Sequence, residues 1–144
     1  MTTVEKGILL EPGEGKSLSV LSDTYTEKVV GRDTNGAFTL MELTLRGEAP
    51  PRHIHDAHEE SFYVLEGEVE FEMGGSSVRG KAGFFVLIPR DTVHTFWSVG
   101  TVPARLLKVI SPPGFERFFE EIDGETDFAK LAAASSKYSV EFVE

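Results

Sequence analysis

The sequence predicts an all-β barrel that is followed by two short helices. Before residue 112, short segments rich in β-branched and aromatic residues are separated by glycine and proline. In the longest of these segments apolar and polar residues alternate with a period of two, which is typical of a strand. After Pro112-Pro113-Gly114 the apolar residues follow a helical period instead. Many short strands with regular turns indicate a sandwich or barrel.

The first strands are expected at residues 17–21, 26–30 and 37–45, with a turn at 34–36, which reads Thr-Asn-Gly. Pro50-Pro51 cannot belong to a central strand, because proline lacks the backbone N–H that a sheet needs. We therefore expect a stiff connection there.

In residues 62–73 apolar and polar residues alternate, which predicts one strand with a solvated side. Its apolar face would carry Val69, Phe71 and Met73, and glutamates occupy the positions between them. Gly74-Gly75 then indicates a hairpin turn. The continuous apolar run at 84–88 predicts a strand that is buried on both faces, and residues 104–110 predict another strand.

Two helical segments follow the β region. The positions that show this helical spacing are Phe115, Phe118, Phe119 and Ile122, and then Phe128, Leu131, Ala132 and Ser135. We expect both helices on the outside of the barrel and a single domain over 1–144, with the barrel at about 15–112 and a helical extension at about 113–138. The closing Val140, Phe142 and Val143 would add an edge strand or dock at a subunit interface.

Composition excludes several kinds of protein. The 144 residues are 40% hydrophobic, which disfavours disorder, and they contain no cysteine, which removes disulfides and thiolate ligands. A net charge of -10 would repel nucleic acid. Because the chain shows no long apolar run, we expect neither a signal peptide nor a membrane span, and a cytoplasmic location.

Four side chains predict a metal site: His53, His55 and Glu60, with His94 downstream. Imidazole and carboxylate are ligands of first-row transition metals. The His-x-His spacing on a strand places both imidazoles on one face, because side chains alternate. The metal could be Fe, Mn, Ni, Co, Cu or Zn, although a closed structural zinc site is disfavoured without cysteine.

The residues around these ligands resemble the motifs of the cupin family. Gly47-x5-His53-x-His55-x4-Glu60-x6-Gly67 meets the first motif in full, and Gly83-x5-Pro89-x4-His94 meets the main positions of the second. The chain departs at Asp91, where the family usually has glycine, and at Ser98, where it usually has asparagine; neither is a ligand. The resemblance implies a double-stranded β-helix, or jelly-roll barrel, similar to small single-domain cupins related to quercetinases.

Glu59 and His58 lie next to the candidate ligands in the sequence, so each must be considered as a ligand as well. The spacing to Gly67 and the family pattern favour Glu60 over Glu59, which alternation turns toward solvent. We expect His58 at the surface, with a supporting or alternative-ligand role as the other possibility.

Alternation also predicts a pocket. Inward-facing ligands imply that Phe62, Phe71, Phe85 and Phe96 together line an apolar cavity beside the metal, as substrate-pocket walls. For any one of them taken alone, barrel core is the simpler interpretation. Arg52 and Arg90 lie beside the ligand segments and are expected at the surface.

The resemblance implies a metal-dependent dioxygenase acting on an enolate or catecholate, with Glu60 as the catalytic base. The alternatives are a non-catalytic cupin that binds a metal or ligand, and a metal-dependent isomerase, cyclase or lyase. Partners are expected to be a small-molecule substrate and a second copy of the chain, in a homodimer. The residues that suggest the dimer are apolar and near the termini: Ile8, Leu9, Leu10, Val140 and Phe142.

Overall fold

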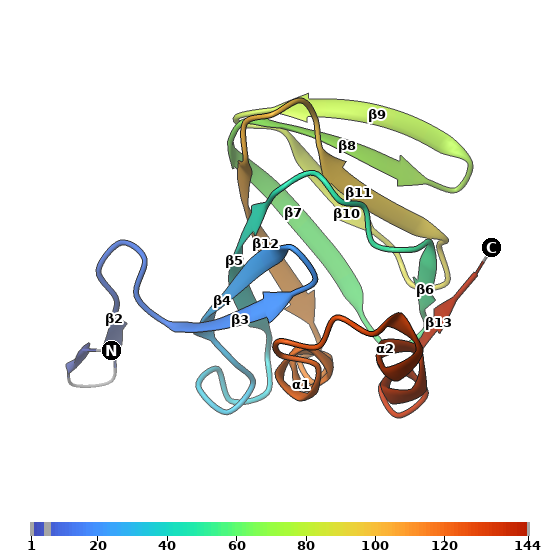
Figure 1. Ribbon diagram of the computed structural model, residues 1–144. Coiled ribbons are helices and arrows are strands. Elements are labelled where there is room, and N and C mark those ends of the chain that lie inside the picture. The colour runs from blue at the N-terminus through green and yellow to red at the C-terminus, as the bar shows by residue number, and fades with distance from the viewer. Residues whose placement is uncertain (1, 5–6, 144) are drawn as a thin grey trace.

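The computed structural model describes residues 2–4 and 7–143. Two antiparallel sheets face each other in the predicted jelly-roll arrangement (Figure 1). The six-stranded sheet has the order β10 (Phe85–Ile88), β7 (Glu59–Glu66), β12 (Ala104–Ser111), β5 (Thr39–Leu45), β4 (Asp23–Val29) and β3 (Lys16–Val20). The five-stranded sheet has the order β13 (Val140–Phe142), β6 (His53–His55), β11 (His94–Ser98), β8 (Glu68–Met73) and β9 (Ser76–Lys81).

The core lies between the two sheets. Every second residue of β5 and β12 is buried, as a strand with one face on the core requires. The largest buried side chains come from both sheets and include Met41, Leu106, Phe62, Phe71 and Phe96. The expected strands at 17–21, 26–30, 37–45 and 104–110 correspond to β3, β4, β5 and β12.

The single strand predicted over 62–73 is wrong, because Gly67 divides it. β7 belongs to the six-stranded sheet and β8 to the five-stranded sheet, so the chain passes from one sheet to the other at this glycine. Gly67 has φ +79°, and a Cβ at this position would lie 2.9 Å from the Cα of Ala104. The alternation changes phase at this glycine, because Phe62 and Val64 are buried in β7 whereas Val69 and Phe71 are buried in β8. This change of phase is a signal of the break that the prediction of one strand overlooked.

Strand β10 is not buried on both faces, which corrects a second expectation. Val86 and Ile88 face the core, but Phe85 and Leu87 are 58% and 48% exposed. β10 is an edge strand, and Phe85 lies opposite Tyr63 on the outer face of the sheet. Phe85 is therefore not a wall of an internal cavity.

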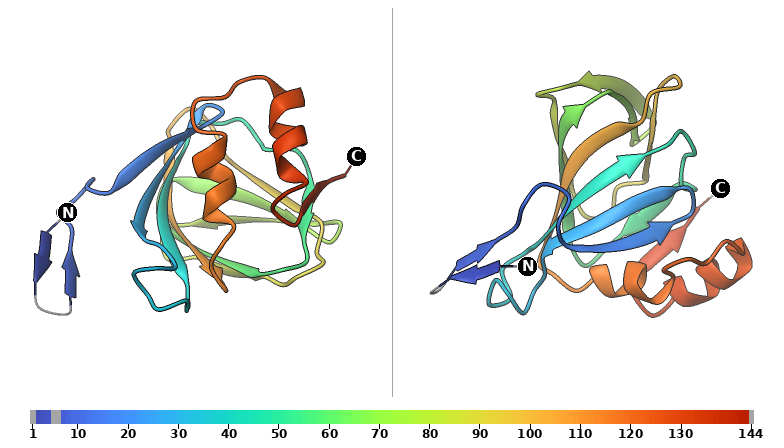
Figure 2. Two further views of the ribbon diagram at one scale, coloured as in Figure 1. Left: turned by 90° about the horizontal axis from the view of Figure 1, so that it is seen from below. Right: turned by 60° about the vertical axis from the view of Figure 1, so that its left-hand side comes forward.

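Helices α1 (Glu116–Glu121) and α2 (Phe128–Ser135) cover one end of the barrel (Figures 1 and 2). They do not simply lie on its outside, because Phe115, Phe118 and Phe119 join the core and the Phe119 ring lies 4.8 Å from that of Tyr25. Within the described residues, no helix is long and apolar enough to cross a membrane.

The strand near the C-terminus joins one of the two sheets, whereas the strands near the N-terminus do not. β13 pairs with β6, which confirms the expected edge strand, and Val140 is buried by this contact, so it is not free for a subunit interface. Phe142 packs on Phe128 instead. The hairpin of β1 (Thr2–Val4) and β2 (Gly7–Leu9) projects away from the sheets (Figure 2), and Leu9 is mostly exposed.

Candidate metal centre

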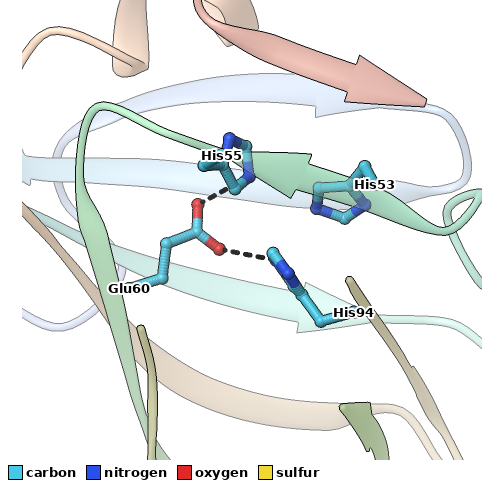
Figure 3. Close-up of side chains that lie close together, drawn as sticks. All are labelled: His53, His55, Glu60 and His94. Atoms are coloured by element: carbon cyan, nitrogen blue, oxygen red, sulfur yellow. Dashed lines mark ion pairs between the residues drawn. The ribbon is translucent and has the colours of Figure 1, made fainter. Parts of the chain in front are cut away.

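The four predicted ligands converge in the interior, from both sheets. His53 and His55 lie on β6, and His94 on the neighbouring strand β11 lies directly opposite His53. Glu60 reaches them from β7 in the facing sheet, and its carboxylate points between the imidazoles of His55 and His94 (Figure 3). All four side chains are buried. The jelly roll therefore gathers residues that are up to forty-one positions apart, from His53 to His94.

The distances among these side chains fit a single metal ion. One ligand atom from each residue lies within 4.8 Å of those of the other three. Nε2 of His55 is 3.3 Å from Oε2 of Glu60, and Nε2 of His94 is 3.3 Å from Oε1. Both of these nitrogens, and Oε1, are buried without a hydrogen-bond partner. Buried polar atoms are rarely left so, and a bound cation would satisfy all of them.

Backbone carbonyls orient two of the imidazoles. Nδ1 of His53 donates to the carbonyl oxygen of Pro51 at 2.8 Å, and Nδ1 of His94 donates to that of Thr92 at 2.8 Å. These contacts fix the tautomer that leaves Nε2 as a lone-pair donor toward the centre of the cluster. The stiff Pro50-Pro51 segment thus acts directly on a ligand.

Burial also keeps the imidazoles of His53 and His55 neutral. It lowers the pKa of His53 to about 4, helped by the neighbouring His94, and the pKa of His55 to about 2. Nearby Glu60 opposes both shifts but does not cancel them. Neutral imidazole is the form that binds metal, so these side chains are ready ligands at neutral pH.

These shifts predict how the metal-free protein responds to acid. Because the pKa of His53 is lowered on folding, its contribution to stability is present above about pH 6.5 and is lost as the pH falls toward 4, by up to about 3 kcal/mol. Asp23 and Glu27, whose pKa values burial raises to about 6 and about 8, act in the opposite direction. The measurement therefore compares two proteins. The free energy of unfolding in urea, with chelator present, is determined from pH 7 to pH 4 for wild type and for His53→Gln, and the difference between them is expected to change with pH. Parallel pH profiles would contradict the prediction.

Known proteins share this sequence pattern. A family model described as a cupin domain matches residues 40–110. Residues 40–110 are a cupin domain. Quercetin 2,3-dioxygenase of Bacillus subtilis (strain 168) is 28% identical over 115 residues, covering 79% of this chain and 34% of that protein. Polyketide synthase CurC of Streptomyces cyaneus is 36% identical over 66 residues, covering 46% of this chain and 43% of that protein.

The fold of this cupin is also found among solved structures. KdgF from Halomonas sp. superposes with a TM-score of 0.67 at 18% identity, over 77% of this chain and 98% of that one. This likeness shows the fold alone. The matches to the two curated relatives span between about a third and a half of the relatives' own length.

His58 is not a surface residue, contrary to the expectation from sequence. Its side chain is 3% exposed, and its Nε2 lies 3.1 Å from Oε2 of Glu60. The imidazole stacks on the ring of Phe115, which precedes α1 and covers the loop between β6 and β7. His58 therefore contacts Glu60, one of the four candidate ligands, without belonging to that group itself.

Sequence reasoning missed Lys108. Its Nζ lies 3.2 Å from Oε2 of Glu60, and its side chain is 2% exposed. The rings within 6.0 Å of the ammonium group are those of Phe119, Tyr25, Phe62, Phe96 and Phe115. A signal was present: on β12 the inward positions are Ala104, Leu106, Lys108 and Ile110, and the lysine interrupts this apolar series.

Glu60 is held as a carboxylate. Burial by itself would raise its pKa, but Lys108 and His55, with His58 and His94, hold the pKa well below the usual range. Burial lowers the pKa of Lys108, and Glu60 opposes this shift. Glu59, in contrast, forms an ion pair with Arg90 near the surface, as its outward position predicts.

A narrow apolar cavity of about 50 Å³ lies beside the cluster. His53, Lys108 and Phe96 contribute to its wall, and the helical extension provides six of the other thirteen lining residues. Phe62 and Phe71 are buried and pack with Phe96, but they stand behind this wall. The aromatic cluster is thus present, and Phe96 is the member of the predicted pocket that reaches the cavity.

Proposed function

We propose that this cupin is a metal-dependent oxygenase whose small-molecule substrate binds as an enolate or catecholate. The observation that carries the proposal is the buried set of three imidazoles and one carboxylate beside an apolar cavity. Nε2 of His55, Nε2 of His94 and Oε1 of Glu60 in this set lack hydrogen-bond partners. A metal ion held there would polarise the substrate oxygen and offer open positions to dioxygen. The likeness to a quercetin 2,3-dioxygenase supports this chemistry.

The side chains then have separate tasks. His53, His55 and His94 hold the metal, and Glu60 completes the ligand set. We propose that a Glu60 oxygen also accepts the proton that the substrate loses; a weak base suffices, because a metal-bound hydroxyl group is more acidic than a free one. The apolar wall, with Phe96, excludes water from the site.

The test begins with the metal. Purified protein is analysed for bound Fe, Mn, Ni, Co, Cu and Zn, reconstituted with each, and given quercetin, catechol or acetylacetone in air while oxygen uptake is recorded. Uptake that requires the metal supports the oxygenase. Tight binding of a probe without turnover would instead indicate the non-catalytic cupin.

Alanine substitutions test the ligand set. His53→Ala, His55→Ala and His94→Ala are each expected to lower metal content after dialysis by at least about tenfold, because loss of one imidazole leaves an incomplete coordination shell. His58→Ala is the matched control, since it removes a buried imidazole that lies outside the group of four. Equal metal retention by all four variants, measured by elemental analysis, would reject the assignment.

A metal-dependent cyclase is the second candidate, and the likeness to the polyketide synthase CurC favours it. Ring closure by condensation needs an enolate at the metal but no oxygen. Turnover of a polyketone probe under strict anaerobiosis would therefore favour the cyclase, because an oxygenase has no turnover without dioxygen.

We further propose a homodimer formed at β10. This strand is a sheet edge among the described residues, and it carries the exposed Phe85 and Leu87 next to Tyr63. Antiparallel pairing with β10 of a second copy would extend both sheets and cover these side chains. Light scattering at micromolar concentration should give twice the 15.9 kDa chain mass, and Leu87→Glu should reduce it to one chain. A monomeric wild type would refute the dimer.

A further inference from the structure

Lys108 changes the charge balance of the proposed metal centre. In the metal-free site its ammonium group neutralises Glu60, the carboxylate of the cluster, at 3.2 Å. The three imidazoles of the cluster add no charge while they are neutral. A divalent metal ion would therefore raise the buried site from no net charge to about +2, and an uncompensated charge of this size is very unfavourable away from water.

We propose that Lys108 is a substrate-positioning residue, which with the metal binds the anionic oxygen of the substrate. The inference rests on the proposed function and narrows it: the substrate must bind as an anion, not as a neutral ligand. Once a metal shares the charge of Glu60, the ammonium group has donors free for a second oxygen. An ammonium group makes strong hydrogen bonds to such an oxygen.

The surroundings of Lys108 support this role. Lys108 and His53 both line the narrow cavity, so the ammonium group and one metal ligand face the same space. Aliphatic and aromatic side chains form most of the rest of its wall, so the electrostatic attraction is little weakened by solvent. A cavity of about 50 Å³ has room for a few atoms, which suits the anionic end of a substrate.

Binding of small probes to the cobalt(II)-loaded protein tests the inference without turnover. Azide is a small anion, imidazole is a neutral metal ligand, and both alter the visible spectrum of protein-bound cobalt(II). In Lys108→Met, azide binding should weaken by about tenfold or more, because the attracting charge is lost. Imidazole binding should change little. Lys81→Met on β9, where the lysine is exposed, is the matched control and should bind both probes as wild type does.

Each outcome decides a different question. Wild-type protein that binds no cobalt rejects the proposed metal site itself. Normal cobalt binding with equal azide affinity in wild type and Lys108→Met rejects the role of Lys108 alone. Lys108→Gln is the second variant, since its amide can still donate to Glu60. If neither variant folds, the lysine is needed to neutralise Glu60 in the core, and the positioning role is rejected.

Discussion

Glu60→Gln is expected to lower turnover by about 10²–10⁴-fold even when the metal site is full, the usual size of a general-base contribution. Glutamine keeps the size of the side chain and one carbonyl oxygen, but it loses the charge and the basicity. Because three imidazoles remain, metal binding should weaken without disappearing. Binding and chemistry should therefore separate in this variant.

The measurement compares turnover with metal occupancy. Wild type and Glu60→Gln are titrated with the active metal, occupancy is determined by elemental analysis, and the rate is measured on the probe that wild type consumes. Recovery of a near-normal rate at full occupancy would show that Glu60 is a ligand and not the base. Glu59→Gln is the matched control, because this neighbouring carboxylate pairs with Arg90 near the surface and should leave the rate unchanged.

The cluster of four candidate ligands could be predicted from the sequence because its geometry is mostly local. His53 and His55 share one face through strand alternation, and Glu60 follows on the next strand. Only His94 needed a longer-range argument, and the second family motif supplied it. Asp91, the departure from that motif, has φ +62°, so it occupies the left-handed conformation in which glycine is usual.

The errors arise where tertiary structure decides. The period of two changes phase at Gly67, where the chain passes between the sheets, but the prediction treated both halves as one strand. An apolar run such as 84–88 predicts burial, but no element of the described chain covers the outer face of β10. His58 is buried because Phe115, fifty-seven residues later, packs on it. Neither the exposed face of β10 nor the burial of His58 has a local signal.

Lys108 is a different case, since the alternation on β12 places it inward but a buried lysine is rare enough that exposure is the natural expectation. The structure resolves the conflict by supplying a counter-charge, Glu60, from the neighbouring strand β7 of the same sheet. Because Lys108 and Glu60 form a buried ion pair, the free energy of unfolding should depend on which other charges are present in the proposed metal centre.

This connection predicts that Lys108→Met destabilises the metal-free protein by about 3–5 kcal/mol, the usual effect of removing one partner of a buried ion pair. Methionine is apolar and similar in length, so the loss comes mainly from Glu60, which is left as a buried charge without its nearest partner. A bound divalent metal supplies the missing positive charge, so most of the stability should return when metal is added.

Urea unfolding with chelator, and again with saturating metal, measures both effects. Lys137→Met is the matched control: Lys137 forms an exposed ion pair with Glu121 at 3.0 Å, and such pairs contribute about 1 kcal/mol or less. The metal should stabilise Lys108→Met more than it stabilises wild type, because removing a positive charge beside the ligands also strengthens metal binding. If metal raised the free energy of unfolding by the same amount in both proteins, there would be no electrostatic interaction between Lys108 and the metal. That result would contradict the prediction.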